Sequence, residues 1–183
     1  MESRIAAIEA QLAIQQLAVR YARSVDSRNL AELGELFSET TDFGPFGKGP
    51  EGCRGFYASQ PVLRNFYRSF HQVVGHVITD VEENTARGTV YCRAEHEDGD
   101  SWVVILMIYF DRYIRQDGQW RFMGRRPRYL CVNDLRETPR EAGFDHWPGR
   151  ESAFGTELPQ SDESWRRFWS EYPEDQARVT SLP

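Results

Sequence analysis

The sequence lacks the features that mark several large classes of protein. It contains no run that approaches the roughly 18 consecutive apolar residues of a membrane-spanning helix. Positive charge is in deficit, because 22 Lys and Arg stand against 28 Asp and Glu, for a formal net charge of −6. This balance disfavours binding to nucleic acid or to anionic membranes. We therefore expect neither as a partner.

Cysteine is also scarce. Cys53, Cys92 and Cys131 are odd in number and have no metal-binding spacing, which predicts a reduced, cytoplasmic protein. The first residues, MESRIAAIEAQ, are polar and amphipathic rather than typical of a signal peptide. The chain has no nucleophile elbow, P-loop, dinucleotide fingerprint or zinc motif.

What is present favours one α+β domain. The 183 residues are 40% hydrophobic and 13% aromatic, enough for one packed core. The apolar spacing predicts a long helix over 3–26 and a shorter one over 29–37. The Gly- and Pro-rich stretch 41–55 predicts a loop with a short strand around Phe43, and Val62 onward predicts a further helix.

The second half of the chain changes character. Four β-rich runs at 72–81, 85–97, 102–115 and 119–132 are separated by breaks short enough for hairpins. Helices followed by such a meander predict a curved, mainly antiparallel sheet with the helices on its concave face. The pattern thins after residue 132, where one short helix is expected at 162–169.

The end of the first helix is unusual. Ile14, Leu17, Tyr21 and Val25 form one apolar stripe, and Asp26 follows where the stripe stops. A carboxylate is unfavourable at the negative end of a helix dipole. Asp26 is therefore poorly explained by helix stability.

Four segments carry a family resemblance: YARSVD, FHQVVGH, ARGTVYCRAEH and YFDRYIRQDGQWRFMGRR. Together they resemble the SnoaL-like branch of the NTF2-like superfamily, which includes scytalone dehydratase, a hexachlorocyclohexane dehydrochlorinase and a bile-acid dehydratase. The resemblance implies a cone-shaped, cystatin-like α+β fold whose mouth holds a small hydrophobic ligand, without metal or organic cofactor. It implies a SnoaL-like domain at 1–132 and leaves 133–183 as an extension that wraps the domain or a neighbouring subunit. It also favours a homo-oligomer, a trimer more than a dimer.

The resemblance assigns catalytic roles to Tyr21, Asp26 and His71. His71 would be the base, Asp26 would orient it and balance its charge, and Tyr21 would donate a proton or a hydrogen bond. An imidazole held by a buried carboxylate suits removal of a proton from carbon. Tyr21 could equally be core, because five residues separate it from Asp26 by about 140° on an ideal helix.

Two further positions follow from the same resemblance. Arg125 matches an arginine five residues past a tryptophan in the dehydrochlorinase, although Arg126 is adjacent and one step along a strand swaps faces. His96 matches a second pocket histidine, with a solvated rim residue as the alternative. His76 is expected to be structural or interfacial, on the face opposite His71 unless a bulge intervenes. Asp111 is expected to form a salt bridge to an arginine of an adjacent strand.

Three functional hypotheses remain open. The first is a cofactor-independent lyase, most plausibly a dehydratase, acting on a hydrophobic cyclic or polyketide-like molecule. The second is a ketosteroid-isomerase-like isomerase or a polyketide cyclase that uses the same His–Asp dyad. The third is a non-catalytic protein that binds small ligands or serves in assembly.

Overall fold

The computed structural model describes residues 2–59, 62–149, 155–174 and 176. Five α-helices and four β-strands appear among them. The helices are α1 (Glu2–Asp26), α2 (Leu30–Glu35), α3 (Gly49–Tyr57), α4 (Pro139–Ala142) and α5 (Glu163–Glu171). The strands are β1 (Arg68–Thr79), β2 (Thr85–Asp98), β3 (Ser101–Gln116) and β4 (Gln119–Asp134). Short 3-10 turns lie at η1 (Gly44–Phe46), η2 (Leu63–Asn65) and η3 (Pro159–Ser161).

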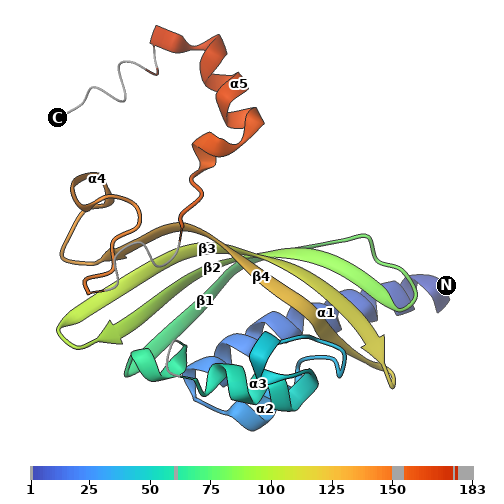
Figure 1. Cartoon of the computed structure of the whole chain (residues 1–183). Coiled ribbons are helices and arrows are strands. Elements are labelled where there is room, and N and C mark those ends of the chain that lie inside the picture. The colour runs from blue at the N-terminus through green and yellow to red at the C-terminus, as the bar shows by residue number, and fades with distance from the viewer. Residues whose placement is uncertain (1, 60–61, 150–154, 175, 177–183) are drawn as a thin grey trace.

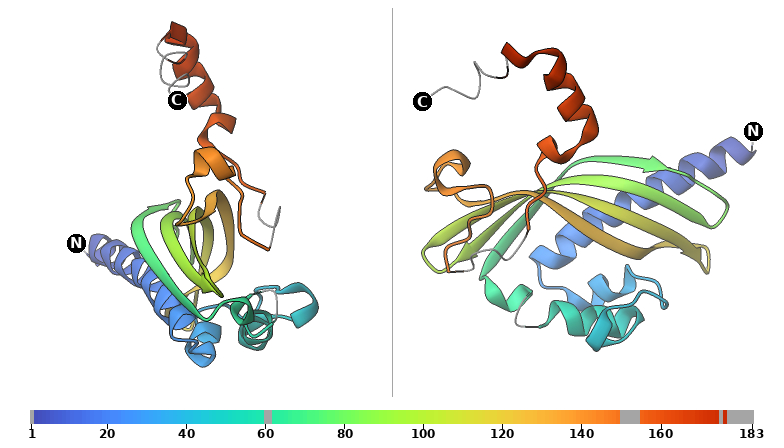
Figure 2. Two further views of the ribbon diagram at one scale, coloured as in Figure 1. Left: turned by 90° about the vertical axis from the view of Figure 1, so that its left-hand side faces the viewer. Right: turned by 45° about the horizontal axis from the view of Figure 1, so that its top comes forward.

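The four strands form a single antiparallel meander in the order β1-β2-β3-β4. The sheet is strongly curved, with α1 running across its concave side and α2 and α3 beside it (Figures 1 and 2). This arrangement confirms the predicted α+β class, the hairpins and the concave placement of the helices.

The apolar stripe of α1 packs against the sheet as its spacing predicts. Ile14, Leu17, Tyr21 and Val25 are 0%, 2%, 6% and 2% exposed. Burying each such side chain contributes about 1.5–3 kcal/mol. The helix therefore lies with its C-terminal half in the core and ends at the mouth of the fold.

Asn29 caps the N-terminus of α2, where its side-chain oxygen accepts a hydrogen bond from the backbone N–H of Glu32 at 3.1 Å.

Two local predictions are wrong. The short strand around Phe43 is reduced to one bridge between Asp42 and Lys48, and α3 begins inside the stretch expected to be a loop. The helix expected from Val62 is only the turn η2, and the chain is already paired with β2 at Arg68. Cross-strand pairing there overrides the local helical preference.

The C-terminal part first returns to the sheet and then leaves it. The backbone of Val132 pairs with residues 144–146. The N–H of Val132 donates to the Phe144 carbonyl at 2.9 Å, and the N–H of His146 donates to the Val132 carbonyl at 2.8 Å. Beyond η3, α5 projects away from the sheet and matches the helix expected at 162–169 (Figure 1). The division of the chain at residue 132 stays a prediction.

Within the described residues, no helix combines the length and apolar character needed to cross a membrane.

Candidate active site

A cavity of about 620 Å³ opens between α1, α3 and the concave face of the sheet. Its wall is mainly aromatic and aliphatic, with a small number of polar groups, as is typical of small-molecule sites. All five residues proposed from the sequence lie at or next to it: Tyr21, His71, His96 and Arg125 line the wall, and Asp26 lies behind His71.

Asp26 and His71 meet directly. Oδ1 of Asp26 lies 2.7 Å from Nδ1 of His71, and Oδ2 accepts the backbone N–H of His71 at 2.8 Å. The two side chains are 24% and 7% exposed, respectively. Burial alone would raise the pKa of Asp26, but its hydrogen bonds and its attraction to His71 lower the pKa below the usual value. Asp26 is thus ionised, and it fixes the imidazole with Nδ1–H as the donor and Nε2 as the free base.

Two residues that sequence reasoning missed support this carboxylate. The hydroxyl of Ser69 donates to Oδ1 of Asp26 at 2.9 Å, and Nη1 of Arg28 donates to the Ser69 oxygen at 2.8 Å. The same Nη1 donates to the carbonyl of Val25 at 2.7 Å, at the C-terminal end of α1. A guanidinium is favourable there and offsets the unfavourable position of Asp26. Nothing in the spacing of these residues signals the contact.

A β-bulge corrects the expected orientation of the two histidines of β1. The register with β2 shifts between Val73 and Gly75, so His71 and His76 both face the concave side. The two histidines nevertheless have different surroundings. His76 lies further along the strand, with Nε2 2.9 Å from the hydroxyl of Tyr113, and does not line the cavity.

Tyr21 lies against the imidazole. Its ring centroid is 6.4 Å from that of His71, edge to face at 86°. Its hydroxyl lies 2.9 Å from the hydroxyl of Tyr57, which comes from α3. Burial raises the pKa of Tyr21, although the nearby Arg125 partly offsets the effect. The hydroxyl therefore stays protonated and can donate a hydrogen bond.

A second bulge settles the ambiguity between the two adjacent arginines. The register of β4 with β3 shifts near Met123, which pairs Arg125 with Asp111 and turns Arg125 toward the cavity. Arg126 lies on the other face, 5.7 Å above the ring of Phe110.

Arg125 is held by a buried ion pair, as predicted for Asp111. Its Nε and Nη2 donate to the two Asp111 oxygens at 2.9 and 2.7 Å, and the side chains are 4% and 0% exposed. Its guanidinium carbon also lies 4.2–4.4 Å from the ring centroids of Tyr21, Tyr109 and Phe122. Burial alone would lower the pKa of Arg125, but the Asp111 carboxylate raises it above its usual value. A permanent cation therefore lies at the cavity wall, with Nη1 outside the ion pair.

His96 is a buried wall residue rather than a solvated rim residue. It is 4% exposed and packs against Phe66 and His71, with ring centroids 4.4 and 5.6 Å apart. Burial, followed by repulsion from His71, lowers the pKa of His96 to about 3. The ring is consequently neutral at physiological pH.

The cavity also contains aromatic residues that the sequence did not single out as a group. Tyr109 and Tyr129 come from β3 and β4, and Trp147 comes from the C-terminal segment. Trp147 is 2% exposed, and its Nε1 donates to an Asp98 oxygen at 2.7 Å. Only a contact across 49 residues reveals this role, so no local pattern could have identified Trp147.

The aromatic residues of the 41–70 region divide between several surroundings. Phe56, Tyr57 and Phe66 line the cavity, whereas Phe46 and Tyr67 are exposed. In the part of the chain that the structure describes, no group of three or more His, Cys, Asp or Glu side chains is placed to hold a metal ion.

Comparison with known proteins identifies the family. The model of the SnoaL-like domain matches residues 6–126. The chain belongs to the SnoaL-like domain family. No curated protein sequence matches this SnoaL-like protein significantly.

Solved structures share its fold. It is similar to the hexachlorocyclohexane dehydrochlorinase LinA-type3 of Novosphingobium barchaimii, with a TM-score of 0.66, 20% identity and coverage of 74% of this chain and 96% of that one. An NTF2-like protein with a cystatin-like fold from Novosphingobium aromaticivorans gives a TM-score of 0.59 at 19% identity, over 70% and 87% of the chains. Rv3472 of Mycobacterium tuberculosis, a protein of unknown function, gives 0.57 at 25%, over 67% and 77%. The NTF2-like, cystatin-like fold is thereby confirmed.

Proposed function

We propose that this SnoaL-like protein is a cofactor-independent lyase that eliminates water from a hydrophobic cyclic or polyketide-like small molecule. One observation carries the proposal: the Asp26–His71 pair, 2.7 Å apart, on the wall of an apolar cavity of about 620 Å³. A carboxylate on Nδ1 leaves Nε2 as the base and stabilises the imidazolium that forms when the base takes a proton.

In the proposed reaction, Nε2 of His71 takes a proton from a carbon beside a carbonyl. The electron pair of the broken C–H bond forms a C=C bond, and the C–O bond to the leaving hydroxyl breaks. The departing oxygen takes the proton from the imidazolium and leaves as water, which restores the neutral ring. Asp26 stabilises the transient imidazolium, while the Tyr21 hydroxyl and Nη1 of Arg125 stabilise negative charge on the carbonyl or leaving oxygen.

The shape of the cavity supports a compact, largely apolar substrate. Pockets of this size bury most of the surface of a small ring system. The polar groups gather at Tyr21, His71 and Arg125, and the neutral imidazole of His96 adds a further contact for the ligand. We propose that a substrate of two or three rings enters with its carbonyl toward Arg125.

The test is turnover of a panel of two- and three-ring cyclic β-hydroxy ketones, followed by product mass. Loss of one water identifies a lyase. His71→Ala and Asp26→Asn should each lower the rate by about 10²–10⁴-fold. His76→Ala is the matched control, since the same residue type on the same strand and face lies outside the cavity, and it should change the rate by less than about threefold.

Other outcomes would replace the proposal. A product of unchanged mass would indicate the isomerase or cyclase, which shares the dyad. Ligand affinity without any turnover in the wild type would indicate a binding protein. Equal rate losses in His71→Ala and His76→Ala would contradict a catalytic role for the Asp26–His71 pair.

We also propose that the protein is a homo-oligomer, favouring a trimer over a dimer, in which α5 contacts a neighbouring subunit. Trp165, Phe168 and Trp169 contact one another on this projecting helix, and Phe168 is 54% exposed. Light scattering of the full chain and of a Phe168→Ser, Trp169→Ser variant tests this, with a smaller assembly expected for the variant. A reduced, cytoplasmic setting belongs to the same proposal, supported by the free thiols of its three cysteines.

A further inference from the structure

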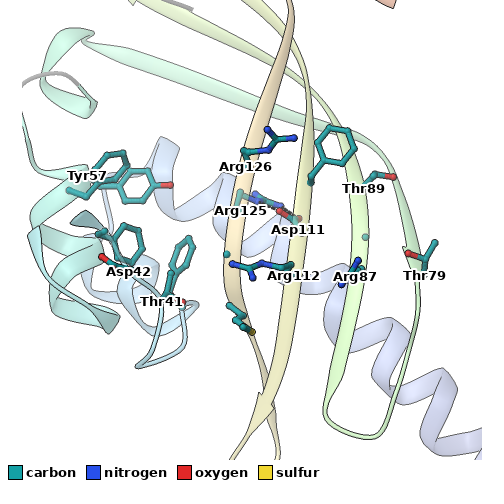
Figure 3. Close-up of a pocket in the computed structure, with 17 residues that line it drawn as sticks. Thr41, Asp42, Tyr57, Thr79, Arg87, Thr89, Asp111, Arg112, Arg125 and Arg126 are labelled. Carbon is teal, nitrogen blue, oxygen red and sulfur yellow. Dashed lines mark hydrogen bonds and ion pairs between the residues drawn. The ribbon is translucent and has the colours of Figure 1, made fainter. Parts of the chain in front are cut away.

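A second hollow of about 850 Å³ adjoins the candidate active site and shares Phe56, Tyr57 and Arg125 with it. Its lining also includes the carboxylates of Asp42, which accepts the backbone N–H of Gly44, and of Asp111, which is paired with Arg125. Figure 3 shows it with α1 behind the sheet, so that Arg87, Arg112 and Arg126 lie on the convex face, which is turned away from the helix. They come from β2, β3 and β4, respectively. The hydroxyls of Thr79 and Thr89 lie on the same side.

The positions of Arg87 and Arg112 are unfavourable for the stability of the sheet. Arg87 and Arg112 are direct cross-strand partners, and like charges in that position destabilise a sheet. In the described part of the chain, no ion pair engages either of them or Arg126. Three unpaired cations on neighbouring strands of a chain with net charge −6 call for an anion.

The other end of the same face behaves differently. There Arg93 pairs with Glu95 at 2.9 Å, and Arg68 pairs with Glu97 at 3.0 Å. Those arginines have carboxylate partners on the sheet, whereas Arg87, Arg112 and Arg126 have no ion-pair partner among the described residues. The contrast shows that unpaired arginine is not a general property of this face.

A glycine and an aromatic ring lie next to two of these arginines. Gly124 stands opposite Arg112, and a Cβ at Gly124 would lie 3.0 Å from Nη2 of Arg112. The glycine therefore lets the guanidinium of Arg112 lie across β4. The guanidinium carbon of Arg126 lies 5.7 Å from the ring centroid of Phe110, which leaves an apolar ring beside the charges.

We infer that this hollow binds a small molecule carrying a phosphate-type oxyanion next to a flat apolar group. Guanidinium forks match the oxygens of phosphate, sulfate and carboxylate, and Arg87, Arg112 and Arg126 supply three of them. Thr79 and Thr89 add hydroxyl donors, and Phe110 offers a stacking surface. The inference does not depend on the proposed lyase activity, because Arg87, Arg112 and Arg126 lie on the face of the sheet opposite His71 and are not among the residues that line the catalytic cavity.

Calorimetric titration with 1-naphthyl phosphate at low salt tests the inference, with inorganic phosphate and 1-naphthol as comparators. We expect naphthyl phosphate to bind more tightly than phosphate, and 1-naphthol not to displace it. Arg112→Met should weaken binding about tenfold or more, since a charge-assisted hydrogen bond is lost. Arg115→Met is the matched control, because it removes the same charge from the same strand on the other face, and it should weaken binding less than about twofold.

Thermal unfolding separates a binding role from a structural one. Naphthyl phosphate at a hundredfold excess over its Kd should raise the Tm of the wild type by about 5 °C or more, and that of Arg112→Met far less. Without ligand, Arg112→Met should unfold no earlier than the wild type, because like-charge repulsion is relieved. Gly124→Asp, which places a carboxylate against Arg112, should abolish binding while retaining the fold.

Several results would overturn the inference. Equal weakening by Arg112→Met and Arg115→Met would indicate non-specific charge attraction. Displacement of naphthyl phosphate by 1-naphthol would place the ligand in the candidate active site. An Arg112→Met variant that unfolds earlier, with ligand affinity unchanged, would assign the arginine a structural role only.

Discussion

Two carboxylate–cation pairs flank the same cavity and differ in what they can do. Asp26 and His71 form a pair whose cation can lose its proton, with side chains 24% and 7% exposed. Asp111 and Arg125 form a sealed pair, 0% and 4% exposed, whose cation is permanent. The first pair can move a proton, and the second can only hold a charge in place.

The two carboxylates accept equally many hydrogen bonds but differ in exposure. Asp26 accepts from the Ser69 hydroxyl and from the backbone N–H and Nδ1 of His71, and its side chain is 24% exposed, so water can replace a lost partner. Asp111 accepts from Tyr113 as well as Arg125, with distances of 2.7–2.9 Å. A buried carboxylate with three such bonds cannot be replaced without leaving donors unpaired. We therefore expect stability to depend on the sealed pair and catalysis on the titratable one.

The largest expected effect on stability comes from Asp111→Asn. The change leaves the guanidinium of Arg125 buried without its counter-charge, which should lower the free energy of unfolding by about 3–5 kcal/mol. Chemical denaturation measures it. The double variant Asp111→Leu, Arg125→Met, which removes both charges, should recover most of the loss, and failure to recover would show that the pair is not the cause.

The next effect concerns pH and the neighbour of the dyad, His96. Its pKa is lowered to about 3 in the folded protein, against about 6.5 for a histidine in an unfolded chain. The unfolded state therefore binds an extra proton between these values. The free energy of unfolding therefore has its full contribution from neutral His96 above about pH 6.5. It falls by on the order of 4 kcal/mol as the pH decreases toward 3.

Denaturation of the wild type and of His96→Leu between pH 7 and pH 4 checks this, with a flatter profile expected for the variant. Asp26 and His71 lie beside His96 and are the same in both proteins. His146→Gln is the control, because it removes a histidine whose side chain is 28% exposed and lies outside the cavity. The same slope in all three proteins would contradict a neutral, buried His96.

Two bulges explain why sequence reasoning recovered the fold more fully than the site. The stripe of α1 and the hairpins follow from local spacing, and the structure confirms both. Strand alternation alone, however, placed His71 and His76 on opposite faces and left Arg125 and Arg126 undecided. The register shifts near Val74 and Met123 decide these cases. A glycine follows each bulged residue, Gly75 after Val74 and Gly124 after Met123, and an isolated glycine within a strand is a bulge signal that strand alternation alone does not use.

Long-range partners were equally hidden. Ser69 contacts Arg28 and Asp26 across 41 and 43 residues of chain, and Trp147 reaches Asp98 across 49. The resemblance to the SnoaL-like branch supplied Asp26 and His71 as a pair, because a shared fold fixes which distant residues meet. The resemblance offered no information on the residues that hold that pair in place. The catalytic roles of Asp26 and His71 stay predictions.

The smallest stability effect should come from the dyad itself, through Asp26→Asn. The amide oxygen can still accept from Nδ1–H of His71, but the backbone N–H of His71 loses its acceptor at Oδ2, so the free energy of unfolding should fall by about 2 kcal/mol at neutral pH. Because the folded pKa of Asp26 is lowered, the carboxylate contributes stability above its unfolded pKa of about 3.9 and loses it as the pH falls through the folded value. The wild type and Asp26→Asn should therefore converge in acid. Comparison with Asp111→Asn by the same denaturation assay ranks the two pairs, and a loss at Asp26 as large as that at Asp111 would show that both pairs are structural.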